Sequence, residues 1–340
     1  MGKQDMRVCD WIAEYLKSIG VDRVHGLMGG GAAGLNDGFI KQGMPYICYN
    51  NEQGAGHAAI GESKYTGRLA VVNPTTGCAG TNCATSVLNA WQDSVPILFI
   101  SGNVRLDTCS GYINKTKNLN IRKYGIQEHN IVDTYKTITK FTHFVERVED
   151  VARVVQQSVQ LAISGRPGPV WIDIPGDIQL AQMPDKYETY DLLTNIVIDK
   201  FESLREIIRS AERPLVLAGY GIRQSGTVHQ FVEFINAYQL PYVSTYGSRD
   251  YTPHDSVFSI GAIGQRGSRA GNFAVQNADL LLILGSSLNA SVVGYDPKQF
   301  APAAKKIMVD IDADELNKDI VKIDYKYNIG LTEFFMGMML

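Results

Sequence analysis

The first half of the chain alternates short apolar runs with longer segments in which apolar residues recur every three to four positions. The runs have the length of strands, and the periodic segments have the spacing of one buried helix face. We expect strands at 24–28, 45–49, 69–73, 96–101 and 169–174. We expect helices at 5–19, 52–67, 81–91 and 148–164. Strands that alternate with helices predict a parallel sheet covered on both faces.

Residues 182–200 break this alternation, because they are polar, contain Pro184 and show no clear period. A second alternating pattern follows them. Its expected helices lie at 203–211 and 228–238, and its expected strands lie at 214–218, 242–245, 279–284 and 306–311. We therefore predict two doubly wound α/β domains with mainly parallel sheets, residues 1–182 and 200–340, joined by a linker at 183–199. The apolar tail at 334–340 needs a covering surface, either in its own domain or on another chain.

Composition narrows the classes of protein. The 340 residues are 45% hydrophobic and 20% charged, with a net charge of -3, which suits a globular protein and argues against a nucleic-acid or anionic-membrane surface. The N-terminus lacks the pattern of a secretory signal, and no apolar run reaches the roughly 18 residues of a membrane span. Five scattered cysteines favour reduced thiols and a cytoplasmic location.

Glu52 lies where an expected strand passes into a helix rich in small residues. This is the carboxyl end of a parallel strand, where α/β folds bind ligands, and small residues allow a close approach. A glutamate at a helix start also complements the helix dipole without any further role. Both interpretations stay open on this segment alone.

The loop at 73–82 joins the next strand to another helix and offers free N–H groups and hydroxyls to a ligand. It lacks the lysine of a P-loop, and the spacing of Gly77 and Gly80 differs from that of a dinucleotide fingerprint. A tight turn before a capped helix is the alternative. A nicotinamide-dependent oxidoreductase is disfavoured because no GxGxxG follows a strand, and the spacing of the histidines predicts no metal site.

Several segments together resemble the thiamine diphosphate enzymes of the acetolactate synthase and 2-oxo acid decarboxylase type. The resemblance covers nearly the whole chain, with residues 1–182 similar to the pyrimidine-binding domain and residues 200–340 similar to the central domain. It rests on the blocks at 52–67, 75–82, 93–96, 127–128 and 165–175, and in the second half on 213–214, 219–221, 261–267, 272–279 and 310–312.

The resemblance implies thiamine diphosphate as the cofactor and a 2-oxo acid such as pyruvate as the substrate of a decarboxylation or carboligation. It assigns Glu52 the catalytic hydrogen bond to the N1′ nitrogen of the cofactor's aminopyrimidine. It further implies a homo-oligomer, because the family's pyrimidine domains pair across a two-fold surface. The implied cofactor-binding residues are Met28, Gly29, Thr76, Gly77, Asn82 and Gln127.

The sequence departs from the family in three places. The family's third domain, which holds the diphosphate and its Mg²⁺, has no counterpart in these residues, so we expect a separate diphosphate-binding chain to supply it. The alternative is a truncated, non-catalytic homologue that serves as a binding or assembly module. Two arginines that hold a flavin in the synthases are replaced by Ser287 and Ser291, so FAD is not expected. Ile126 replaces a phenylalanine of the synthase substrate pocket, which leaves the substrate open.

Overall fold

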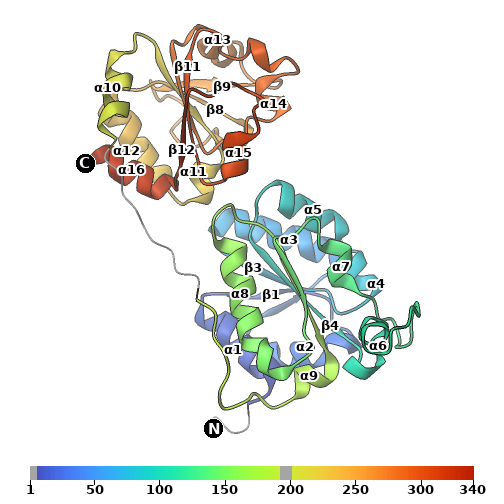
Figure 1. Cartoon of the computed structure of the whole chain (residues 1–340). Helices are drawn as coiled ribbons and strands as arrows, with labels where there is room; N and C mark the ends of the chain where they lie inside the picture. The colour runs from blue at the N-terminus through green and yellow to red at the C-terminus, as the bar shows by residue number, and fades with distance from the viewer. Residues whose placement is uncertain (1–5, 192–200) are drawn as a thin grey trace. The chain divides into compact units, whose positions relative to one another are not determined.

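A computed structural model describes residues 6–191 and 201–340, and each range contains one compact α/β unit (Figure 1). Each unit has a sheet of parallel strands flanked by helices, which confirms the predicted fold class. The domain boundaries proposed from the sequence stay a prediction. Residues 192–199 of the predicted linker, residue 200 of the second predicted domain and residue 5 of the first predicted helix lie outside the described residues.

The first sheet has the order β2-β1-β3-β4-β6-β5, and every neighbouring pair is parallel. Its central strands β4 and β6 are buried along their whole length, as the uninterrupted apolar runs predict. The strands are β1 (Val24–Gly26), β2 (Tyr46–Cys48), β3 (Ala70–Asn73), β4 (Ile97–Asn103), β5 (Phe141–Phe144) and β6 (Val170–Pro175).

Successive side chains of these strands point to opposite faces, so the sheet forms two cores. Leu98 and Ile172 pack with one set of helices, whereas Phe99 and Trp171 pack with the other. The first core contains α1 (Val8–Ser18), α2 (Ala33–Lys41) and α8 (Val151–Ile163), and the second contains α3 (Glu52–Thr66), α5 (Ala84–Gln92) and α7 (Ile131–Tyr135). The remaining helices are α4 (Cys78–Thr81), α6 (Ser110–Lys117) and α9 (Gly176–Leu180).

The second sheet has the order β12-β11-β10-β7-β8-β9 and is also parallel throughout. Its strands are β7 (Pro214–Ala218), β8 (Tyr242–Ser244), β9 (Ser259–Ala262), β10 (Leu280–Leu284), β11 (Lys305–Asp310) and β12 (Tyr325–Asn328). Its helices are α10 (Glu202–Ser210), α11 (Gly221–Gln224), α12 (Val228–Tyr238), α13 (Arg269–Asn277), α14 (Ala290–Val293), α15 (Ala313–Asn317) and α16 (Leu331–Met339).

The apolar tail finds its covering surface within its own unit. Phe334 and Phe335 of α16 are fully or almost fully buried and pack against Phe234 of α12. Of the two alternatives that the sequence left open, the structure shows the first.

The sequence analysis missed the strands β5, β9 and β12, the helices α2, α6 and α13, and several helices of four or five residues. These strands have partly or largely exposed side chains, so they lack the apolar runs by which the other strands were predicted. Among the described residues, no helix has both the length and the apolar character needed to cross a membrane.

Candidate functional site

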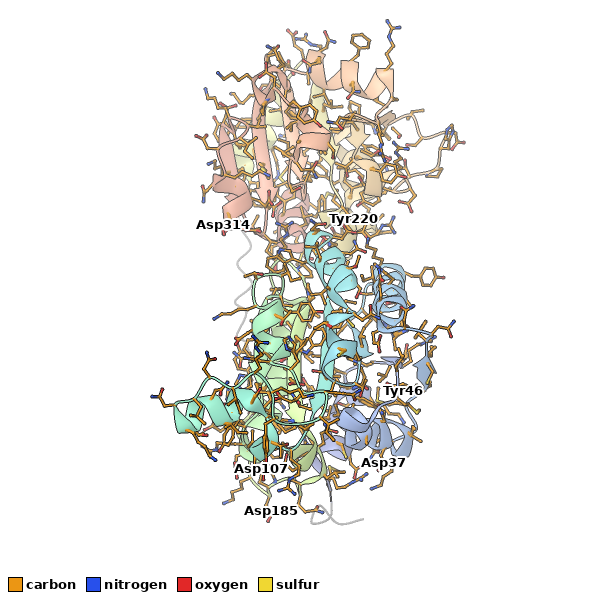
Figure 2. The ribbon with its side chains drawn as sticks, turned by 90° about the vertical axis from the view of Figure 1, so that its right-hand side faces the viewer. Asp37, Tyr46, Asp107, Asp185, Tyr220 and Asp314 are labelled. Carbon is orange, nitrogen blue, oxygen red and sulfur yellow. The ribbon has the colours of Figure 1, made fainter. Side chains whose placement is uncertain are left out.

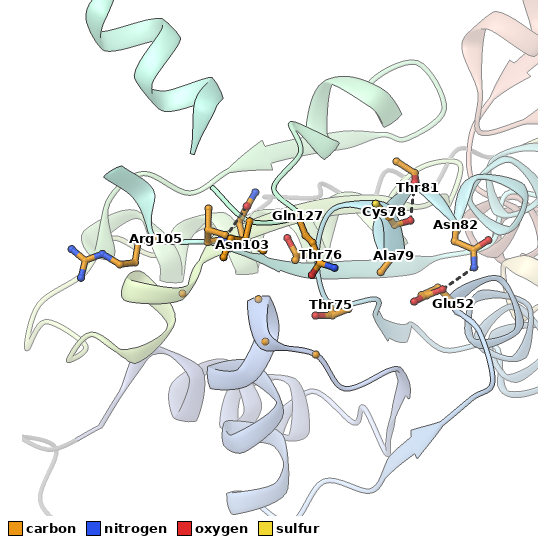
Figure 3. A pocket seen from close by; sticks show the side chains of 16 residues that line it. Glu52, Thr75, Thr76, Cys78, Ala79, Thr81, Asn82, Asn103, Arg105 and Gln127 are labelled. Carbon is orange, nitrogen blue, oxygen red and sulfur yellow. Dashed lines mark hydrogen bonds between the residues drawn. The ribbon is translucent and has the colours of Figure 1, made fainter. Parts of the chain in front are cut away.

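A cavity of about 1020 Å³ opens at the carboxyl edge of the first sheet (Figure 3). Its walls come from the segments that follow the strands: Gly29–Gly31 after β1, Glu52 after β2, residues 75–82 after β3, Asn103–Arg105 at the end of β4 and Gly176 after β6. Ile126 and Gln127 complete the lining. Parallel strands bring the loops after them to one edge, which is why residues far apart in sequence meet here.

The position of the cavity follows from the order of the strands. From β1 the chain crosses to β2 on one side, and β3 then lies on the other side of β1. The helices α2 and α5, which follow β1 and β3, therefore pack on opposite faces of the sheet, an arrangement that places a ligand crevice at its carboxyl edge. Glycines line the β1 side and threonines the β3 side of this crevice.

Glu52 begins α3, directly after the N-cap residue Asn51, whose side chain accepts a hydrogen bond from the Gly54 N–H. The Asn82 Nδ2 group donates to Glu52 Oε2 at 2.7 Å, drawn as a dashed line in Figure 3. Asn82 thereby fixes the orientation of the carboxyl group. Glu52 is half-buried and lines the cavity, so the structure brings these two predicted site residues together.

Gly77 and Gln127 form a close backbone contact at the cavity wall. A Cβ atom at Gly77 would lie 1.7 Å from the Gln127 carbonyl oxygen, so only glycine fits there. Gln127 and Thr75 adopt positive φ angles of 59°, a conformation that L-residues rarely take. Strained backbone of this kind is concentrated at functional sites, where the surrounding structure maintains it.

Thr75 and Thr76 present hydroxyl groups that are buried and make no hydrogen bond in the described part of the chain. The glycines of the β1 loop pack against them so closely that a Cβ at Gly29 or Gly31 would lie within 2.6 Å of a threonine atom. An unmade buried hydrogen bond destabilises a protein, so these two hydroxyls are a feature of the cavity wall that the described hydrogen bonds do not account for.

The predicted site residues divide into three groups. Gly29, Thr76, Asn82 and Gln127 line the cavity with Glu52, and Gly77 supports the wall through its backbone. Met28 is 53% exposed and does not line the cavity. The roles given to all these residues stay predictions.

The sequence analysis missed Asn103 and Arg105, which also line the cavity. Their only signal is their position at and just after the end of β4, which the predicted strand at 96–101 left outside its bounds.

Asp173 lies beneath this cavity and is fully buried. The Ser101 hydroxyl donates to its Oδ1 at 2.6 Å and the Asn103 Nδ2 group donates to its Oδ2 at 2.7 Å. The Trp171 indole N–H donates to the same Ser101 hydroxyl at 2.9 Å. Burial raises the pKa of Asp173 to about 7, and the two hydrogen bonds only partly oppose this shift.

This shift predicts a pH dependence of stability. Between about pH 4 and pH 7 the folded state keeps the Asp173 proton that the unfolded state releases, so this group makes the fold less stable as the pH rises. In Asp173→Asn, we expect this contribution, on the order of 4 kcal/mol, to be absent. Urea unfolding at pH 4 to 8 measures it, since all three tryptophans lie within residues 6–191 and report on the first unit. A constant difference between variant and wild type across this range would contradict the prediction.

The second unit holds the residues on which the flavin prediction rests. Ser287 and Ser291 follow β10, and the Ser287 carbonyl accepts a hydrogen bond from Lys318. Ser291 Oγ donates to Asn289 Oδ1 at 2.6 Å. That this unit binds no FAD stays a prediction. Within residues 6–191 and 201–340, no group of three His, Cys, Asp or Glu side chains is arranged to hold a metal ion.

Comparison with known proteins agrees with this arrangement. Residues 6–133 match the model of the thiamine pyrophosphate enzyme N-terminal TPP binding domain, and residues 201–332 match that of the central domain of the same enzymes. Similar curated proteins include the acetolactate synthase isozyme 2 large subunit of Escherichia coli (strain K12), 31% identical over 92% of this chain and 55% of its own. The acetolactate synthase large subunit of Lactococcus lactis is 33% identical over 92% of this chain and 53% of its own.

A probable acetolactate synthase large subunit of Methanocaldococcus jannaschii is 28% identical over 93% of this chain. The chain spans about half the length of the curated relatives it matches. The two matched models together cover more than half of the 340 residues. The chain therefore belongs to the thiamine pyrophosphate enzymes, of which it carries the N-terminal and central domains.

Proposed function

We propose that the cavity of the first unit binds the aminopyrimidine part of thiamine diphosphate (thiamine pyrophosphate) in an acetolactate synthase-like enzyme. Its substrate is a 2-oxo acid such as pyruvate, and its reaction is decarboxylation or carboligation. The diphosphate and its Mg²⁺ are held by a domain outside residues 1–340. The observation that carries the proposal is the pairing of Glu52 with Asn82 at the edge of a cavity with two unsatisfied hydroxyls.

The residues present fit an aminopyrimidine. The ring is flat and carries hydrogen-bonding nitrogens, which suits a crevice where the close glycine contacts exclude side chains. The Thr75 and Thr76 hydroxyls offer the polar partners that such a ring lacks once it leaves water. When bound, the cofactor supplies the electron sink for loss of carbon dioxide from the 2-oxo acid.

The chain's own residues bind the aminopyrimidine and orient the carboxyl group of Glu52. Asn82 holds Glu52 Oε2, which leaves Oε1 for a ring nitrogen, and a carboxyl group at that position can hold or release a proton. Gly77 and Gln127 keep one wall flat. Ile126 is 80% exposed beside the cavity and offers apolar surface to a small substrate.

Calorimetry tests the proposal directly. We expect thiamine diphosphate with Mg²⁺ to bind residues 1–340 tightly only when a diphosphate-binding domain of an acetolactate synthase-like enzyme is added, because the cavity of the first unit is proposed to hold the pyrimidine part of the cofactor. We call this combination the reconstituted enzyme. Tight binding to residues 1–340 alone contradicts the divided site. Absence of binding in both samples contradicts the proposal and favours the non-catalytic alternative.

We further propose that the chain forms a homo-oligomer through its first unit. Leu88 and Trp91 of α5 and Tyr65 of α3 are 40%, 40% and 92% exposed, which is a large apolar surface for two neighbouring helices. Such a surface is typical of an interface between copies of a chain. The relatives' names, as large subunits, also support an assembly.

A further inference from the structure

Residues 110–124 form a compact excursion between β4 and α7, which we call the basic arm. Glu128 closes its base, since its buried carboxylate accepts hydrogen bonds from the Ser110 hydroxyl at 2.9 Å and from the Tyr124 N–H at 3.0 Å. Asn114 bonds both backbone groups of Ile121 within the arm. Its helix α6 lies at the edge of the first unit, near the labelled Asp107 (Figure 2). The arm is therefore an ordered structure.

The arm and the segment before it are strongly basic. Residues 105–124 contain five basic side chains and one acidic side chain, a net charge of +4, whereas the whole chain carries -3. This concentration of positive charge is a local feature that the composition hides. It attracts anions through both direct contacts and its long-range field. The basic residues are Arg105, Lys115, Lys117, Arg122 and Lys123.

Three of these cations have no acidic partner in the part of the chain that the structure describes. Lys115 pairs with Glu146 at 2.8 Å and Arg105 pairs with Asp107 at 3.2 Å. Lys117, Arg122 and Lys123 are exposed, and no carboxylate in the described residues lies within 4.0 Å of their nitrogens. A fixed arm with unpaired lysine and arginine side chains is what recognition of a phosphate group requires.

The arm is continuous with the cavity. Arg105, just before it, lines the cavity, and so do Ile126 and Gln127 just after it. Gly125 joins the arm to this wall, where a Cβ atom would lie 2.6 Å from the Val104 side chain. Both ends of the arm therefore meet the cavity wall, so a small molecule that extends from the cavity along the arm would meet its cations. A small substrate would use both the cavity and the arm, whereas an acidic macromolecule would use the arm alone. The adjacency of the two therefore favours a substrate.

We propose that the basic arm binds the phosphate group of a phosphorylated acceptor substrate, which makes this chain selective for phosphorylated aldehydes or ketones. The inference rests on the proposed function, because it names the second substrate of that site. In the carboligation, the 2-oxo acid loses carbon dioxide, and its former carbonyl carbon bonds to the carbonyl carbon of the acceptor. The acceptor oxygen takes up a proton.

Binding of glycerol 3-phosphate, an unreactive probe, tests the proposal without cofactor or turnover. Phosphorus NMR follows the probe as the chain is added, and glycerol, which lacks the phosphate group, serves as competitor. The arm variant is K117Q/R122Q/K123Q, and the matched control is K186Q/R209Q/K298Q, which removes the same charge from exposed positions elsewhere. We expect at least tenfold weaker binding by the arm variant and less than twofold weaker binding by the control. Binding to the wild type should weaken with salt, and glycerol should not compete.

Three outcomes overturn the proposal. The first is equal binding of the probe by the arm variant and the wild type, and the second is a loss of binding in the control variant as large as that in the arm variant. The third is displacement of the probe by a peptide of ten glutamates that binds more tightly than the probe. The last result would assign the arm to an acidic protein partner. Glu52→Gln separates this inference from the proposed function, because its probe binding should equal that of the wild type. If thiamine diphosphate never binds but the phosphate probe does, the proposed function fails and the phosphate site stands.

Discussion

Replacement of Glu52 by glutamine is expected to lower turnover of the reconstituted enzyme by at least about 100-fold, the lower range for loss of a proton-transferring group. Asn82 Nδ2 donates to one oxygen of Glu52, so the amide oxygen of the glutamine would take that position. The amide NH₂ would then face the ligand. This group neither accepts a hydrogen bond nor exchanges a proton as a carboxyl group does. Release of carbon dioxide from pyruvate measures the rate.

Glu14→Gln is the matched control, because Glu14 is exposed on α1 and makes the same change from carboxylate to amide. Its rate should equal that of the wild type. Unfolding of both variants, followed by tryptophan fluorescence, should match the wild type, since Glu52 is only half-buried. A Glu52→Gln enzyme with wild-type turnover would remove this residue from its proposed role.

The fold was largely predictable because the central strands are buried on both faces. The seven residues of β4 and the six of β6 are all buried, and their continuous apolar runs at 97–100 and 170–172 make the strands stand out in the sequence. Edge strands lack this signal. Strand β12 has mostly exposed side chains and is recognised only by its pairing with β11.

The site was predictable in part. Glu52 stands out because a carboxylate follows a strand and begins a helix of small residues, and the resemblance to a known family added Asn82 and Gln127. The contact between Gly77 and Gln127 joins residues 50 positions apart, and no local pattern encodes it. The basic arm was missed for a different reason: its polar helix α6 has no continuous apolar face, and its charge is offset by acidic residues elsewhere.

Replacement of Gly77 by alanine is expected to destabilise the first unit by at least about 3 kcal/mol, because two separate penalties combine at this residue. Its φ of 57° and ψ of -120° suit only glycine, and the added Cβ would lie 1.7 Å from the Gln127 carbonyl oxygen. The Cβ is fixed to the backbone of residue 77 and the oxygen belongs to the backbone of Gln127, so relief of the clash must separate residues 75–82 from Gln127. Thiamine diphosphate binding to the reconstituted enzyme should therefore be lost as well.

Gly67→Ala provides the control for backbone conformation alone. Gly67 ends α3 with a φ of 70° and a ψ of 14°, and no atom lies within 4 Å of an added Cβ. Its replacement should cost only about 1 kcal/mol, the usual penalty for a left-handed alanine, and should leave cofactor binding intact. Urea unfolding followed by tryptophan fluorescence compares the two variants. Equal losses of stability would show that the contact with Gln127 contributes nothing, and the cavity wall would then tolerate a side chain at position 77.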